Sequence, residues 1–126
     1  MRDRLYLAMR IKEVATGSVE GSAKLFKAFS DPVRLRLVNL LAGGEVCVCH
    51  LHEALGLPQP TVSRHLAYLR GTGVVVGRKD GLWVHYRLSE ASTELHRILI
   101  DAVAPALADL GAMRADRERL SRLTCC

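Results

Sequence analysis

Apolar residues recur at helical spacing in two stretches of the first third of the chain, residues 23–30 and 33–41. Asp31 and Pro32 lie between them and are typical of a helix start. The Asp31 carboxylate can accept hydrogen bonds from the free amides of the first helical turn. Proline is tolerated there because the amide hydrogen that it lacks would have no partner within the helix. The second helix is predicted to turn three apolar residues inward and two arginines outward: Leu35, Val38, Leu41, Arg34 and Arg36.

Two shorter helices are predicted further along the chain, over residues 48–55 and from residue 59 to Gly71 or Gly73. Gly56 supplies the turn between them, and two short helices joined by a glycine turn form a helix-turn-helix. Three apolar residues of the second helix have the spacing of a core-facing side: Val62, Leu66 and Leu69.

The other side of this second helix is polar at its N-terminal end. Its exposed residues are predicted to be Gln59, Thr61, Ser63, Arg64 and His65. Side chains of these types read base edges or hold phosphates when a helix enters the major groove of DNA. A solvated polar face is the simpler interpretation of an isolated helix, but the segment that follows favours DNA binding.

Residues 74–88 change from helical spacing to alternation, with Asp80-Gly81 between two β-rich runs, which is a strong hairpin signal. Arg78 and Lys79 lie beside the predicted tip. A basic hairpin after a helix-turn-helix is a wing that can contact phosphates or the minor groove, although charge also protects ordinary sheet edges. One face of the second strand is predicted to hold Leu82, Val84, Tyr86 and Leu88, and the other Trp83, His85 and Arg87. The predicted fold class is mainly α with a small β-hairpin, a winged helix-turn-helix.

The two ends of the chain are interpreted as dimerisation segments. Residues 1–22 contain either an amphipathic helix or a basic extension, and residues 89–113 are predicted to form one long helix capped by Ser89, kinked at Pro105 and carrying an apolar stripe. With a 23–88 core and a 114–126 tail, the 126 residues make a single winged-helix domain. A two-fold dimer would present two reading helices to half-sites about 34 Å apart, or a multiple of that distance.

Composition narrows the class of function. The formal net charge of +5 permits an anionic partner such as double-stranded DNA. No signal peptide and no apolar run near 18 residues is recognisable, so we expect a cytoplasmic protein without a membrane partner. No nucleophile–base pair and no phosphate-binding loop is recognisable either, so an enzyme is not expected.

Four cysteines form two pairs, Cys47 with Cys49 and Cys125 with Cys126. Structural disulfides are rare in the cytosol, and thiolates near a helix N-terminus are stabilised by the helix dipole, so the first pair is a candidate soft-metal or redox site. The alternative is two small packing residues. Residues two apart point to nearly opposite sides of a helix, so one ion can hold both sulfurs only if Cys47 precedes the helix or the first turn deforms.

Four segments together resemble the ArsR/SmtB metal-sensing repressors over about residues 24–100. They are Ser30-Asp-Pro-Val-Arg-Leu-Arg-Leu-Val, Glu45-Val-Cys-Val-Cys-His-Leu, Gly56-Leu-Pro-Gln-Pro-Thr-Val-Ser-Arg-His-Leu-Ala-Tyr-Leu-Arg and Arg78-Lys-Asp-Gly-Leu-Trp-Val-His-Tyr-Arg-Leu. The resemblance implies a homodimeric winged-helix repressor that needs no cofactor for DNA binding and is released from its operator when a thiophilic ion binds.

The chain also departs from the family's metal sites. Where arsenic sensors carry a third cysteine it has His52, and His50 stands where an acidic residue is usual. The cysteines that cadmium and lead sensors carry near the N-terminus are missing from residues 1–46. The zinc site of the family's last helix is matched only at Glu94 and His96, so we expect that site to be absent and His96 to be a surface or interface residue.

Trivalent arsenic and antimony favour three thiolates. We therefore expect As(III) or Sb(III) as the inducer, held by Cys47, Cys49 and one of Cys125 and Cys126, which the other subunit could supply. Three alternatives stay open: a divalent soft metal in a mixed site with His50 or His52, a thiol-redox repressor, and an unstructured terminal cysteine pair.

Overall fold

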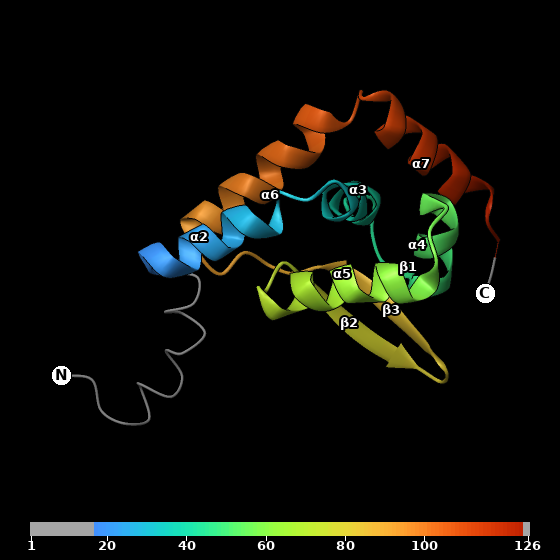
Figure 1. The fold of residues 1–126 in the computed structure, drawn as a ribbon, viewed down its shortest axis with the longest axis horizontal. Helices are drawn as coiled ribbons and strands as arrows, with labels where there is room; N and C mark the ends of the chain where they lie inside the picture. The colour runs from blue at the N-terminus through green and yellow to red at the C-terminus, as the bar shows by residue number, and fades with distance from the viewer. Residues whose placement is uncertain (1–16, 125–126) are drawn as a thin grey trace.

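The computed structural model describes residues 17–124 (Figure 1). Most of the predicted N-terminal segment and the Cys125–Cys126 pair therefore lie outside the described residues. In chain order the elements are α2 (Val19–Ala28), α3 (Pro32–Leu41), β1 (Val46–Cys47), α4 (Val48–Leu55), α5 (Gln59–Gly71), β2 (Val75–Asp80), β3 (Trp83–Leu88), α6 (Glu94–Leu107) and α7 (Gly111–Arg122).

Helices α4 and α5 confirm the predicted helix-turn-helix. Gly56 ends α4 in the left-handed region at φ 69°, a conformation that glycine adopts without steric cost. The three predicted core residues of α5 are fully buried: Val62, Leu66 and Leu69. The local sequence pattern was enough to predict these two helices, because each of them buries one apolar side against the same core.

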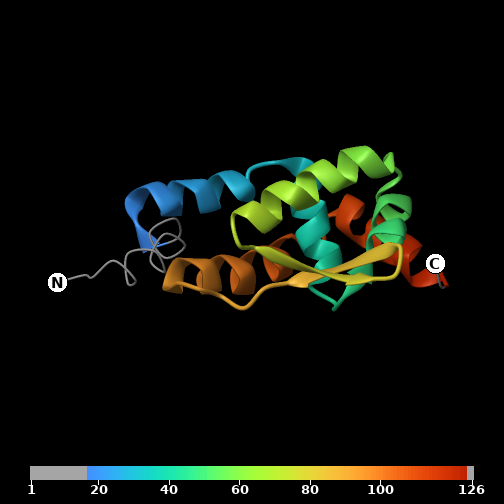
Figure 2. The ribbon, with the colours of Figure 1, turned by 90° about the horizontal axis from the view of Figure 1, so that it is seen from below.

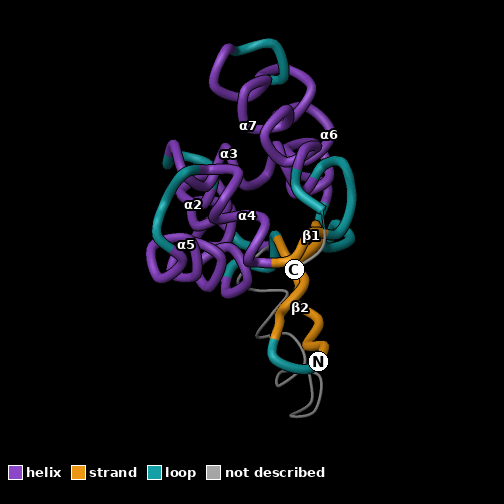
Figure 3. Tube along the Cα trace, turned by 90° about the vertical axis from the view of Figure 1, so that its right-hand side faces the viewer, coloured by secondary structure: helices purple, strands orange, loops and turns teal. Residues whose placement is uncertain are grey.

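The wing is a three-stranded antiparallel sheet with strand order β1-β3-β2, and Figure 3 shows its hairpin projecting away from the helices. Asp80 pairs with Trp83, so the loop is Gly81-Leu82, one residue later than predicted, with Gly81 at φ 64°. Leu82 lies in this loop and is 90% exposed, so the prediction that it belongs to the second strand, on one face with Val84 and Tyr86, was wrong. The third strand, β1, was not predicted, because two residues are too few to show alternation.

Helix α3 begins as predicted. The Asp31 carboxylate accepts hydrogen bonds from the amides of Val33 at 2.9 Å and Arg34 at 3.1 Å. The prediction that Arg34 and Arg36 point to solvent was wrong, because both guanidinium groups bind groups of neighbouring helices. An arginine side chain can bury its aliphatic part while its guanidinium group still forms hydrogen bonds. The charge of Arg34 and Arg36 was therefore not enough to identify the solvent-facing side of α3.

The segment after the wing differs most from its prediction. Ser89 does not cap a helix, and its hydroxyl donates to the Gly73 carbonyl. The cap of α6 is Thr93, whose hydroxyl accepts from the His96 amide at 3.1 Å. Pro105 lies inside α6, which ends at Leu107, before the predicted end of the helix. Helix α7 covers the last residues of the predicted helix and most of the predicted tail. Helix α7 packs against α3 and α4.

Helix α3 lies between α5 on one side and α6 on the other, as Figure 2 shows. Several apolar residues of α6 pack against the core: Leu95, Leu99, Ile100, Val103 and Ala104. Part of the predicted stripe therefore packs within the chain. Val19 and Phe26 on α2 and Ile98 on α6 stay largely exposed. No helix among residues 17–124 is long and apolar enough to cross a membrane.

Candidate functional site

The N-terminal half of α5 exposes the side chains expected to face DNA. Gln59 and Arg64 are exposed, and Thr61 and Ser63 are half-buried. The buried side of α5 fixes the helix on the core, because Val62 and Leu66 are fully enclosed. A helix held in this way presents a constant pattern of donors and acceptors to a groove.

His65 was predicted to be exposed, but its ring lies among other side chains. Its Nδ1 is 3.3 Å from Arg34 Nη1 and 3.6 Å from Asp31 Oδ2, and the side chain is only 20% exposed. Arg34 also donates to the carbonyls of Lys27 and Ala28, both at 2.9 Å, and lies 4.2 Å from the centre of the Tyr68 ring. His65 thus connects the reading helix to the junction of α2 and α3.

The two basic residues of the wing differ in their surroundings. Lys79 is exposed, whereas Arg78 donates to both carboxylate oxygens of Glu45, at 2.8 and 3.2 Å. The hydrogen bond from Arg78 lowers the pKa of Glu45, and the same bond raises the pKa of Arg78. Glu45 immediately precedes β1, so this ion pair joins the wing to the segment that leads into the cysteine pair.

Cys47 and Cys49 are adjacent in space. Their sulfur atoms are 3.1 Å apart, and Cys47 is the last residue of β1 and precedes the first residue of α4. The condition set by the sequence spacing is therefore met, since Cys47 lies before the helix. Cys47 is a buried free thiol and Cys49 is half-buried and disulfide-bonded. Both sulfurs can serve as ligands of one ion once Cys49 is reduced.

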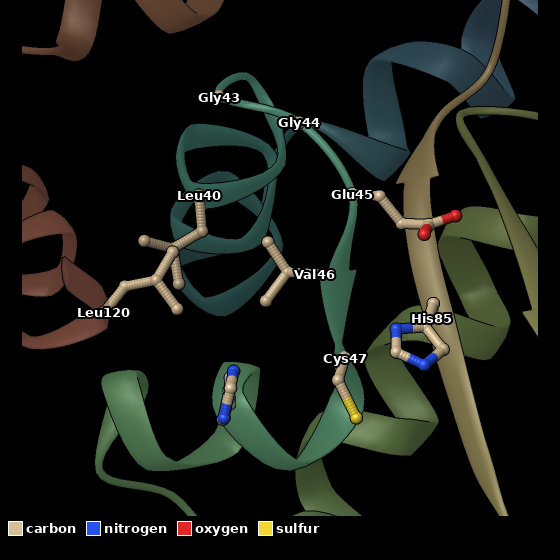
Figure 4. Close-up of a pocket in the computed structure, with 9 residues that line it drawn as sticks. Leu40, Gly43, Gly44, Glu45, Val46, Cys47, His85 and Leu120 are labelled. Atoms are coloured by element: carbon tan, nitrogen blue, oxygen red, sulfur yellow. The ribbon is translucent and has the colours of Figure 1, made fainter. Parts of the chain in front are cut away.

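A cavity of about 500 Å³ lies beside Cys47. Figure 4 shows the Cys47 thiol and the His85 ring close together, with Leu40 and Leu120 on the opposite side. The residues that line it come from α3, the following loop, β1, α4, β3 and α7: Leu40, Gly43, Gly44, Glu45, Val46, Cys47, His50, His85 and Leu120. Sequence reasoning missed His85 as a neighbour of the cysteines, because only the β1–β3 register brings it there.

The two predicted histidine alternatives are also separated. His50 lines the cavity, whereas the ring of His52 lies 3.2 Å from the Leu57 carbonyl at the other end of α4. Within residues 17–124, no three His, Cys, Asp or Glu side chains are already grouped as metal ligands. A three-ligand site therefore needs either movement of these side chains or a ligand from outside this range.

His96 is not the surface or interface residue that was predicted. It is fully buried, its Nδ1 accepts from the Ser92 amide at 3.2 Å, and its Nε2 has no hydrogen-bond partner among the described residues. Burial lowers the pKa of His96, because the charged ring would lose its hydration.

The comparisons with known proteins agree with this geometry. The family described as "Bacterial regulatory protein, arsR family" matches residues 31–76. The chain is 55% identical over 67 residues to the arsenical resistance operon repressor of Escherichia coli K12, a match that covers 52% of this chain and 57% of the repressor.

Two solved structures have the same winged-helix architecture. One is the homodimeric winged helix-turn-helix DNA-binding domain Mb0332 from Mycobacterium bovis, with a TM-score of 0.61, 28% identity and coverage of 78% of this chain and 89% of that chain. The other is the cadmium sensor CMTR from Mycobacterium tuberculosis, with a TM-score of 0.53, 34% identity and coverage of 70% and 84%. The helix-turn-helix, the wing and these similarities together establish that the chain belongs to the ArsR/SmtB family of transcriptional regulators.

Proposed function

We propose that this protein is a transcriptional repressor that binds double-stranded operator DNA as a homodimer and is released when As(III) or Sb(III) binds its cysteine thiolates. The observation that carries the proposal is the 3.1 Å separation of the Cys47 and Cys49 sulfurs at the start of α4. Helix α4 is the first helix of the helix-turn-helix, so a ligand bound there acts next to the reading helix.

DNA binding is assigned to α5 and the wing. We assign Gln59, Thr61, Ser63 and Arg64 to contacts with base edges or phosphates, and Lys79 to a contact with the DNA backbone beside them, because Gln59, Arg64 and Lys79 are exposed and Thr61 and Ser63 are half-buried. His65 has a supporting role, since its ring binds Arg34 rather than facing a groove. The exposed apolar residues of α2 and α6 are assigned to the dimer: Val19, Phe26 and Ile98.

The binding chemistry is ligand exchange without redox change. Arsenous acid carries three hydroxyl groups, and each thiol that forms an arsenic–sulfur bond releases one of them as water. Three thiols therefore give one arsenic trithiolate and three waters, and arsenic stays trivalent. Cys49 must be reduced first, because a disulfide sulfur has no thiolate to offer. The third sulfur is assigned to Cys125 or Cys126.

Ligand binding is expected to act on DNA affinity through α4. An ion bound to both sulfurs acts on the path of the chain from β1 into α4, since Cys47 belongs to the strand and Cys49 to the helix. Only the short turn at Gly56 separates α4 from α5. A displacement of α4 is therefore passed to the reading helix, which has to fit the groove closely to bind.

The cavity supports a second candidate function, release by a divalent soft ion. His50 and His85 share the cavity with Cys47, and mixed nitrogen and sulfur ligands suit zinc and similar ions. The related CMTR protein is described as a cadmium sensor. In this alternative the terminal cysteines are not required.

Fluorescence anisotropy of the reduced protein on DNA from upstream of its own gene tests these assignments. The complex is titrated in parallel with arsenite, antimonite, cadmium, lead and zinc. We expect arsenite and antimonite to release wild type, and Cys47→Ser and Cys49→Ser to keep DNA affinity but lose release. Release retained in both variants contradicts the thiolate assignment.

The remaining outcomes choose between the alternatives. Release by divalent ions alone moves the assignment to the mixed site. Release by diamide in metal-free buffer, with no response to any ion, moves it to a thiol-redox repressor, which would use the same cysteines.

A further inference from the structure

Two arginines of α3 reach opposite sides of the helix-turn-helix. Arg34 and Arg36 are two positions apart, and residues with this spacing lie on nearly opposite sides of a helix. Each guanidinium group donates to carbonyls at the C-terminal end of a neighbouring helix, Arg34 at the end of α2 and Arg36 at the end of α4. Carbonyls of a last helical turn have no amide of their own helix to bind, so the arginines supply donors there.

Arg34 also binds the middle of the reading helix. Its Nη1 donates to His65 Nδ1 at 3.3 Å, and its guanidinium carbon lies 4.2 Å from the centre of the Tyr68 ring. Its remaining contacts to the carbonyls of Lys27 and Ala28, both at 2.9 Å, hold the planar guanidinium in one orientation. His65 and Tyr68 are three positions apart and lie on the same side of α5. Arg34 therefore opposes rotation of the reading helix.

Arg36 holds the turn that leads into the reading helix. Its Nη2 donates to the carbonyl of Leu55 at 3.0 Å, and Leu55 is the last residue of α4. Only residues 56–58 separate α4 from α5. The place where α4 ends therefore decides where the first side chains of α5, Gln59 and Thr61, are presented.

A buried carboxylate of α7 holds Arg36 in turn. The side chain of Asp116 is 0% exposed, and its oxygens accept from Arg36 Nε at 2.7 Å and Arg36 Nη2 at 2.8 Å. Arg119 donates to the same carboxylate, and its Nε donates to the Ala54 carbonyl at 2.7 Å. A buried charge is tolerated when its hydrogen bonds are satisfied in this way. Helix α7 is thus joined to the end of α4 by two arginines around one carboxylate.

We propose that Arg34 and Arg36 are positioning residues for DNA reading, and that Asp116 acts through Arg36. Arg36 sets the start of α5 and Arg34 sets its middle. The inference rests on the proposed function and adds that sequence preference depends on contacts which never touch the DNA. Base edges are read by hydrogen bonds that need correct placement, whereas attraction to phosphates is independent of sequence. Loss of either arginine should therefore reduce the preference for operator DNA more than the affinity for DNA in general.

Arg117 of α7 provides a matched control. It donates to Asn39 Oδ1 at 2.7 Å and to the Ala108 carbonyl at 2.8 Å, so it also joins α7 to α3. Neither partner belongs to α4 or α5. Arg117→Gln therefore removes the same charge and the same kind of hydrogen bond as Arg36→Gln, but leaves the contacts that hold the reading helix.

Fluorescence anisotropy at one salt concentration compares DNA from upstream of the gene with a random-sequence duplex of equal length. The ratio of the two affinities is the readout. We expect Arg34→Gln and Arg36→Gln each to lower this ratio about a hundredfold, a tenfold loss in each half-site, as for one mismatched base pair. Arg117→Gln should keep the wild-type ratio, and the three variants should bind the random duplex alike.

An unchanged ratio in Arg34→Gln or in Arg36→Gln contradicts the role of that arginine. An equal loss in Arg117→Gln also contradicts the inference, because it would show that any loosened contact of α3 has this effect. A wild-type protein that binds both duplexes equally removes the proposed function itself.

Two milder variants serve if the arginine variants do not fold, which thermal unfolding checks. Arg119→Gln keeps the Arg36–Asp116 pair and removes the bond to the end of α4, and Tyr68→Leu removes the ring beside Arg34. Each should still lower the ratio, by about tenfold. A wild-type ratio in both folded variants would overturn the inference.

A second measurement separates the start of α5 from its middle. Operator duplexes with single base-pair changes are first bound to Gln59→Ala and to Arg64→Ala, to find the positions that each side chain reads. Arg36→Gln should lose discrimination mainly at the positions of Gln59, and Arg34→Gln mainly at those of Arg64. A uniform loss at all positions in both variants would indicate a general disturbance and overturn the assignment.

Discussion

Cys47 lies directly opposite His85 across the antiparallel pair of β1 and β3. Side chains at such positions have Cβ atoms about 5 Å apart and point to the same face of the sheet. The same row continues to Arg78 on β2, which is held by Glu45. A ligand at Cys47 is therefore in reach of the wing as well as of the helix-turn-helix.

Replacing His85 with Gln separates the two candidate inducers. We expect release by cadmium or zinc to weaken about tenfold, because an imidazole ligand is lost, while release by arsenite stays unchanged, because arsenic(III) favours thiolates. The control is His52→Gln, since His52 binds the Leu57 carbonyl away from the cavity. Equal losses for arsenite and cadmium in His85→Gln would contradict this division.

The two basic wing residues are expected to contribute differently to DNA binding. Lys79→Gln should lower the slope of log K against log salt by about 1.8 for the dimer, which loses one phosphate contact in each subunit at about 0.9 per contact. Arg78→Gln should lower it by less than half as much, because Glu45 already neutralises Arg78. Salt titrations of DNA affinity provide the measurement, and equal slopes for the two variants would show that Arg78 leaves Glu45 for the DNA.

His96 should make stability depend on pH. The pKa of His96 in the folded protein is lowered from the ordinary value of 6.5. At a pH just below 6.5, this histidine is therefore protonated in the unfolded chain but still neutral in the folded protein. Stability therefore falls as pH decreases from 6.5 towards the folded pKa, by at most about 1.4 kcal/mol per pH unit.

Urea unfolding between pH 5 and 8 measures this effect. His96→Phe keeps a ring of similar size and cannot titrate, so its curve should lack this part of the pH dependence. Parallel curves for wild type and variant would assign the pH dependence to other groups.

Glycine substitutions test the packing of the wing. A Cβ at Gly77 would lie 3.2 Å from side-chain atoms of both Tyr86 and Val84, so Gly77→Ala should cost about 1 kcal/mol and weaken DNA binding. At Gly71, the last residue of α5, an added Cβ meets nothing within 4 Å. Gly71→Ala should therefore stabilise by about 0.5 kcal/mol, measured by thermal unfolding. A stabilising Gly77→Ala would show that the wing relaxes around the methyl group.

Local signals account for the parts of the fold that the sequence predicted. The Asp31 cap, the Gly56 turn and the buried side of α5 each depend on residues within a few positions of one another. The turn of the hairpin was predicted to within one residue, because its Asp80-Gly81 signal is also local. The predicted helix over residues 48–55 agrees with α4, so the position of Cys47 directly before that helix was predicted as well.

Contacts between distant segments account for what was missed. Helix α7 docks mainly through charged and polar groups, so its apolar pattern is weak, and its partner Arg36 lies 80 positions away from Asp116. His85 joins the cysteine cavity only through the register of a two-residue strand. Ser89 and Thr93 are both acceptable caps in sequence, and packing of the chain after the wing decides between them.

Helix α4 is restrained at both of its ends. Its N-terminal end continues directly from a strand paired into the sheet, and its C-terminal carbonyls are held by Arg36 and Arg119. A short rod held at both ends resists tilting, because tilting would break one set of these bonds. Rolling about its own axis disturbs them least. An ion held by Cys47 and Cys49 applies its force off that axis, so the expected response of α4 is a small rotation that turns Gly56 and the start of α5 with it.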